Sequence, residues 1–323
     1  MRFGKMGATL CAALVAATLM LYARPSAGAA QNGADTAQGP PLKIQVNLVN
    51  LFATVRDKKT KQIFSNLEQS DFKVSEDGKE QKITSFSKES TLPVTLGLLL
   101  DTSGSEQYTL GAEQDAAMQF LTRVMRKGDL TMVMSFDSDS DLLADFTDDL
   151  SRLQRAIRRA QINTPGGQGP LAGNVAGTVF YDAVYLACHD KLAEEAGRKA
   201  LVIVTDAYDE GSKLRIQDAI EAAQRTDTVV HILLIGDPAH FYVDESDARK
   251  ISDETGGRTI VVRSEKNLQQ AFDQISEELR SQYTLGYYST NSARDGGYRK
   301  VKVETTRKDL DVLTRRGYYA PTE

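Results

Sequence analysis

The chain of 323 residues has no tryptophan, two cysteines and three histidines. So few sulfur and imidazole ligands exclude a zinc ribbon or a fold framed by disulfides. Lys and Arg number 39 against 44 Asp and Glu, so the formal net charge is -5 and there is no excess of positive charge for binding phosphates. We therefore expect no nucleic acid partner, and any chemistry must depend on carboxylates, hydroxyls and the main chain.

The sequence also lacks three motifs that mark common active sites. It contains no G-x-S-x-G elbow, no H-E-x-x-H and no phosphate-binding Walker loop. Hydrophobic residues make up 41% and charged residues 26%, which is typical of a globular chain. The length is enough for about two domains.

The N-terminus has the pattern of an export signal. Arg2 and Lys5 precede an apolar run from Ala8 to Tyr22, and small residues follow up to Ala30. The run is shorter than the ~20 apolar residues that span a bilayer. We expect residues 1–30 to be a cleaved signal peptide, with no stable membrane span afterwards, and the protein to be secreted or periplasmic; an uncleaved anchor is the alternative.

The rest of the chain divides into a β region, an α/β region and a second β region. Residues 31–42 have the small, polar composition of a linker. Residues 43–92 and 282–323 both show short strands separated by turns, including the hairpin signal Asp77-Gly78. Neither set is large enough for its own core. We expect the two sets to pair with each other, with the α/β region of residues 93–281 inserted between them; two separate β appendages are the alternative.

The α/β region predicts a doubly wound sheet. Residues 94–100 and 200–204 are continuous apolar runs, typical of strands that are buried on both faces. Strands alternate with helical patterns, which implies right-handed crossovers and a mostly parallel, Rossmann-like sheet. The last strand pattern of the chain runs from Val312 to Tyr319.

Oxygen ligands follow two of these predicted strands. Asp101, Ser103 and Ser105 form a D-x-S-x-S sequence after the first strand, and Asp206 ends the other. The carboxyl ends of the two strands flank the switch point of a doubly wound sheet, where such sheets bind ligands. Thr178 lies at the end of a glycine-rich loop that starts at Thr164. Carboxylates and hydroxyls suit a hard cation such as Mg²⁺, so we predict a metal site made of these five residues.

The same residues give the chain a resemblance to the von Willebrand factor type A family. The resemblance covers about residues 93–281, and the sequence Tyr-Thr-Leu-Gly-Tyr-Tyr from Tyr283 makes the chain similar to bacterial secreted members. It implies a metal-ion-dependent adhesion site in which the two serines and commonly Thr178 bind Mg²⁺, Ca²⁺ or Mn²⁺. A carboxylate of a protein partner would complete the metal shell. Ala207 stands where that family often has glycine, so the turn there is expected to differ.

Three functions remain open at this point. The first is a secreted, non-enzymatic adhesion module that captures an acidic side chain of a partner through the cation. The second is a metal-dependent hydrolase with Asp206 or Asp209 as general base. The third is a structural domain whose site is unused. The spacing of Asp137, Asp139 and Asp141 imitates a calcium loop, but the required glycine is missing, so we expect a charged hairpin turn.

Overall fold

The computed structural model describes residues 48–88, 92–162, 177–235 and 243–322. The predicted signal peptide and linker lie outside the described residues, and so do residues 164–176 of the glycine-rich loop. Residues 46–323 form one compact unit. Within the described residues, no helix has both the length and the hydrophobicity needed to cross a membrane.

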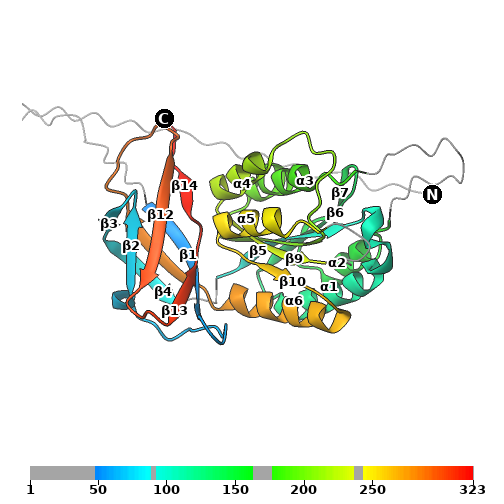
Figure 1. The fold of residues 1–323 in the computed structure, drawn as a ribbon, viewed down its shortest axis with the longest axis horizontal. Coiled ribbons are helices and arrows are strands. Elements are labelled where there is room, and N and C mark those ends of the chain that lie inside the picture. Colours follow the sequence, from blue (N-terminus) through cyan, green and yellow to red (C-terminus); the bar gives the residue numbers. More distant parts are fainter. Residues whose placement is uncertain (1–47, 89–91, 163–176, 236–242, 323) are drawn as a thin grey trace, which may run out of the picture. The chain divides into compact units, whose positions relative to one another are not determined.

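A central sheet lies between two layers of helices in the α/β region (Figure 1). It has six strands in the order β10-β9-β8-β5-β6-β7. All neighbouring pairs are parallel except β6 and β7, which are antiparallel. The predicted doubly wound, mostly parallel sheet is therefore confirmed. The strands are β5 (Val94–Asp101), β6 (Leu130–Phe136), β7 (Ser140–Thr147), β8 (Arg198–Thr205), β9 (Thr228–Leu234) and β10 (Thr259–Val261).

Helices cover both faces of this sheet (Figure 1), which is why every residue of β5 is buried. One face packs against α1 (Leu110–Val124), α2 (Leu150–Ile157) and α6 (Glu265–Arg280), and the other against α3 (Phe180–Leu186), α4 (Ile216–Arg225) and α5 (Glu245–Thr255). Helix α3 continues through a π turn and a 3₁₀ turn to Glu194. Cys188 lies in this continuation as a buried free thiol and belongs to the core.

The β regions from the two ends of the chain form two four-stranded sheets around one core. Strand β1 pairs with β11 from Leu48↔Tyr288 to Ala53↔Tyr283, and β12 pairs with β2. Their orders are β13-β1-β11-β4 and β14-β12-β2-β3. The strands are β1 (Leu48–Asp57), β2 (Phe72–Glu76), β3 (Lys79–Gln81), β4 (Ile83–Lys88), β11 (Tyr283–Tyr288), β12 (Tyr298–Thr305), β13 (Leu310–Leu313) and β14 (Gly317–Tyr319), with a 3₁₀ turn at Gln69–Asp71.

The prediction of a single last strand from Val312 to Tyr319 is wrong. The chain instead forms β13 in one sheet and β14 in the other. Between them it contacts the end of α5, where Arg315 forms an isolated bridge with Thr255 and the N–H of Arg316 donates to the carbonyl of Glu254 over 3.2 Å. This contact interrupts the strand and lets the last residues cross to the second sheet.

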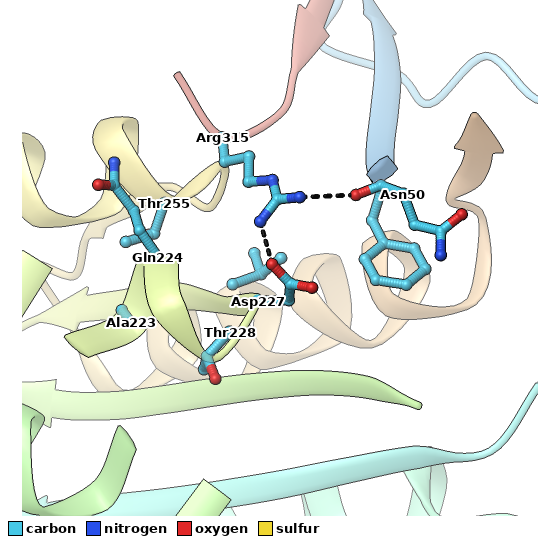
Figure 2. Close-up of a pocket in the computed structure, with 9 residues that line it drawn as sticks. Asn50, Ala223, Gln224, Asp227, Thr228, Thr255 and Arg315 are labelled. Atoms are coloured by element: carbon cyan, nitrogen blue, oxygen red, sulfur yellow. Dashed lines mark hydrogen bonds and ion pairs between the residues drawn. The ribbon is translucent and has the colours of Figure 1, made fainter. Parts of the chain in front are cut away.

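Arg315 links the β sheets to the α/β region (Figure 2). Its guanidinium donates to the main-chain carbonyl of Asn50 over 2.8 Å and forms an ion pair with Asp227. Together with Phe52 and Thr255, these residues line a small pocket. Asp227 directly precedes β9, so this contact lies at the amino-terminal edge of the central sheet.

Candidate metal centre

The predicted ligands gather at the opposite, carboxyl-terminal edge of the central sheet. Asp101 is the last residue of β5, and Asp206 follows the last residue of β8. The two strands are parallel neighbours up to the pair Leu100↔Val204. The order of strands changes direction here, so the side chains lie where a doubly wound sheet binds its ligands.

The Asp101 loop is held by hydrogen bonds to both oxygens of a fully buried carboxylate. The N–H of Ser103 donates to Oδ1 over 2.9 Å, and the hydroxyl of Thr205 donates to Oδ2 over 2.6 Å. The Oγ atoms of Ser103 and Ser105 lie 3.0 Å apart. The D-x-S-x-S loop thus brings a carboxylate and two hydroxyls into one small space.

The Asp206 loop turns through Ala207, which has a left-handed φ of 60°. The expectation that alanine would change this turn is wrong, because Ala207 adopts the conformation that glycine takes more readily. Its N–H donates to Oγ1 of Thr205 over 2.9 Å, and the next N–H, of Tyr208, donates to Oδ1 of Asp206 over the same distance. These hydrogen bonds support the strained residue and orient the Asp206 carboxylate.

Thr178 lies next to the Asp206 loop. Its N–H donates to the carbonyl of Glu210 over 3.1 Å, and its own carbonyl accepts from the N–H of Glu210 over 3.0 Å. The following N–H, of Val179, donates to the carbonyl of Asp137, whose carboxylate accepts from Thr102 beside Asp101. Within the described part of the chain, the Thr178 hydroxyl itself makes no hydrogen bond to the other four predicted ligands. Main-chain hydrogen bonds thus hold Thr178 beside the loop that follows Asp206.

Glu106 joins the cluster, and the sequence analysis missed it. Carboxylate oxygens of Asp101, Glu106 and Asp206 all lie within 4.8 Å of one another. Glu106 is only 1% exposed and sits in the 3₁₀ turn Gly104–Tyr108. Its Oε2 accepts from the hydroxyl of Thr109 over 2.7 Å, while Oε1 has no hydrogen-bond partner.

Glu113 on helix α1 is a fourth buried carboxylate beside the cluster. It is fully buried, and neither of its oxygens has a donor when both carboxylates are ionised; a proton on Glu106 lets the two carboxylates hydrogen-bond to each other. A signal for both glutamates was present in the sequence. Glu106 directly follows the D-x-S-x-S loop, and Glu113 precedes the apolar residues Ala116 and Ala117 by three and four residues, a spacing that puts them on one face of a helix.

Burial and mutual repulsion shift these carboxylates toward their protonated forms. Burial, followed by the charge of Glu106, raises the pKa of Asp101 to about 8. Burial raises the pKa of both Glu106 and Glu113, and Glu113 raises that of Glu106 further. Burial also raises the pKa of Asp206, against hydrogen bonds from Tyr208 and Ser105. Buried acids of one sign need a counterion or protons.

The residues fit a divalent cation. Carboxylate and hydroxyl oxygens are the donors that Mg²⁺ and Ca²⁺ prefer, and oxygens within 4.8 Å of one another can surround one ion. The buried oxygens of Glu106 and Glu113 that accept no hydrogen bond from a donor group would be stabilised by a nearby cation. Bound here, the ion would be held by Asp101, Ser103, Ser105 and Asp206, with Thr178 available from the adjoining segment.

Two neighbouring acidic groups have other roles. Asp137 to Asp139 form the turn between the antiparallel strands β6 and β7, with the N–H of Asp137 donating to the carbonyl of Asp139, and Asp141 lies in β7, so the predicted hairpin is confirmed. Asp209 accepts from the N–H of Tyr181 and the hydroxyl of Ser212 through one oxygen. It fastens the start of α3 to the loop after β8.

Comparisons with known proteins agree with this architecture. Residues 96–211 match the family model of the von Willebrand factor type A domain, which confirms the resemblance seen in the sequence. A solved von Willebrand factor type A structure from Catenulispora acidiphila is 13% identical, with 80% of this chain and 76% of that chain covered and a TM-score of 0.50.

Two further solved structures are similar. Proximal thread matrix protein 1 from the mussel byssus is 10% identical, with 64% of this chain and 51% of that chain covered and a TM-score of 0.50. The conserved hypothetical protein BatB from Bacteroides thetaiotaomicron is 16% identical, with 58% and 100% covered and a TM-score of 0.46. A comparison with curated proteins found no similar sequence. At these identities the similarity concerns the fold.

Proposed function

We propose that this chain is a binding module that captures a protein partner through a divalent cation, because residues 96–211 match the family model of the von Willebrand factor type A domain. The ligands are Asp101, Ser103, Ser105 and Asp206, with Thr178 completing the set. The observation that carries this proposal is the group of buried carboxylates within 4.8 Å of one another at the end of β5 and β8.

The partner is a protein that presents an acidic side chain. A cation at this edge attracts an external carboxylate, and the half-buried Ser105 marks the side from which it approaches. We further propose that residues 1–30 direct the chain out of the cytoplasm and that residues 31–42 link the signal to the first strand. The α/β domain of residues 93–281 is then presented by the β strands at its two ends. Mg²⁺ is the proposed cation, with Ca²⁺ and Mn²⁺ as alternatives.

The Asp101→Ala variant tests this function. We expect it to lose Mg²⁺ binding in isothermal titration calorimetry, with affinity at least about 100-fold weaker, because removing this carboxylate also frees Ser103. It should also lose the acidic partner recovered from the exported protein fraction. The Asp148→Ala variant, which changes an exposed aspartate, is the matched control and should behave as the parent. A parent chain that binds its partner equally well in chelator would contradict the proposal.

The geometry favours binding over hydrolysis. A hydrolase would need a general base beside the metal, and the Asp209 oxygen that accepts from Tyr181 and Ser212 is committed to the loop. Asp206 would have to act as ligand and base at once. We therefore propose a non-enzymatic role, which metal-dependent turnover of ester or phosphoester substrates, lost in Asp206→Asn, would refute.

A further inference from the structure

We propose that Glu106 is an internal ligand of the cation and that its charge weakens the attraction of the cation for an external carboxylate. This inference rests on the proposed function, because it assigns a further residue to the same site. The side chain of Glu106 would then limit the affinity of the module for its partner.

The position of Glu106 supports ligation. Its carboxylate lies within 4.8 Å of those of Asp101 and Asp206. Oxygens bound to Ca²⁺ at 2.3–2.6 Å lie at most about 5 Å apart, and those bound to Mg²⁺ lie closer. Three carboxylates in this arrangement can share one ion, although Glu106 comes from a 3₁₀ turn and the other two from strand ends.

The hydrogen bonds of Glu106 support the same role. One oxygen accepts from Thr109, and the other has no partner although the residue is buried. The carboxylate of Glu113 lies within hydrogen-bonding reach of Glu106, so without a cation the two acids must share a proton to avoid repelling each other. A buried carboxylate oxygen without a donor is costly, and a cation would satisfy it. In the described residues, the ion pairs include neither Glu106 nor Glu113, so no Lys or Arg fills this need.

Charge balance then gives the consequence for the partner. A divalent cation held by Asp101 and Asp206 has its charge neutralised, with neutral hydroxyls completing the set. Adding Glu106 makes the loaded site negative, so an incoming carboxylate is repelled more than it would be without Glu106. The partner must therefore compete with a carboxylate that is already in place.

The Glu106→Gln variant in the full chain tests this inference. It keeps the shape and an oxygen that can accept from Thr109 but removes the charge. Glu194→Gln, an exposed glutamate in another 3₁₀ turn, is the matched control. Calorimetry with Mg²⁺ and proton relaxation with Mn²⁺, which reports metal-bound water, are measured with and without acetate as the carboxylate probe.

We expect Glu106→Gln to bind Mg²⁺ at least about tenfold more weakly, to gain about one metal-bound water and to bind acetate more tightly once loaded. Equal cation affinity and equal water count in parent and variant would overturn the inference and leave the proposed function standing. A parent chain that binds no cation would overturn both. Should Glu106→Gln fail to fold, Glu106→Asp retains the charge and shortens the side chain, and unchanged affinity in that variant would likewise count against the inference.

Discussion

At the scale of single residues, the buried carboxylates predict how stability depends on pH. In the folded chain the pKa of Asp101 is about 8, against an unfolded value of about 3.9. Between these pH values the folded state retains a proton that the unfolded state has lost, so stability is highest at low pH and falls as pH rises toward 8. In chelator, we expect the free energy of unfolding to fall by about 1.4 kcal/mol per pH unit for each proton retained.

Excess Mg²⁺ should reduce this fall, because the cation replaces the proton. Urea unfolding between pH 5 and pH 8, followed by circular dichroism since the chain has no tryptophan, measures the slope. Exposed aspartates such as Asp149 have a lowered pKa and titrate below this range. For the Asp101→Asn variant, the slope of unfolding free energy against pH should correspond to about one retained proton fewer than for the parent. A parent chain with stability independent of pH in chelator would contradict the assignment.

The same residues show where sequence reasoning succeeds and where it stops. The D-x-S-x-S loop and Asp206 could be predicted because each directly follows a buried strand, and parallel strands end at one edge. The positions of Glu106 and Glu113 in the sequence provided only a weak signal, because acidic side chains normally face solvent. Only the structure shows that both are buried beside the cluster.

At the scale of helices and strands, the sequence predicts those features that are determined by residues close together in the chain. The start of α6 depends on such a local contact, because the hydroxyl of the N-cap residue Ser264 accepts from the N–H of Asn267. The split between β13 and β14 was not visible, because it depends on contacts of Arg315 and Arg316 with the distant end of α5. The alternation of residues carries no information about such a partner.

Helix α6 gives a prediction at this scale. Phe272 is fully buried, and its ring centroid lies 4.8 Å from that of Phe120 on α1. We expect Phe272→Ala to lower the free energy of unfolding by about 3–5 kcal/mol, because it leaves a cavity between two helices and the sheet. Phe272→Leu should cost less, since it fills most of that space. Equal urea midpoints for Phe272→Ala and the parent would show that the two helices do not depend on this contact.

At the scale of the whole molecule, the two edges of the central sheet have different contacts. The candidate metal centre lies at the carboxyl ends of β5 and β8, and Arg315 joins the β sheets to the region before β9, at the amino-terminal edge. We expect Arg315→Ala to lower the melting temperature, because it leaves Asp227 and the Asn50 carbonyl without this donor. The Mg²⁺ affinity should stay within about twofold of the parent value, since the two edges share no ligand.

Calorimetry of Arg315→Ala beside the parent measures both quantities. The conservative Arg315→Lys is the control, since it keeps the charge but cannot reach both acceptors with the same planar group. A large loss of Mg²⁺ affinity in Arg315→Ala, with the fold retained, would show that the two edges are energetically coupled.

The pairing of β1 with β11 and β13 sets an order of events during folding. Leu48 lies opposite Tyr288, so the first described strand waits for some 240 residues to be synthesised before its neighbour exists. The intervening domain takes its strands from a continuous stretch of chain and can form earlier. Residues 62–64 can already pair with the end of β1, but until the C-terminal strands arrive the rest of β1 keeps unpaired main-chain groups, which exposes the nascent protein to association with other strands.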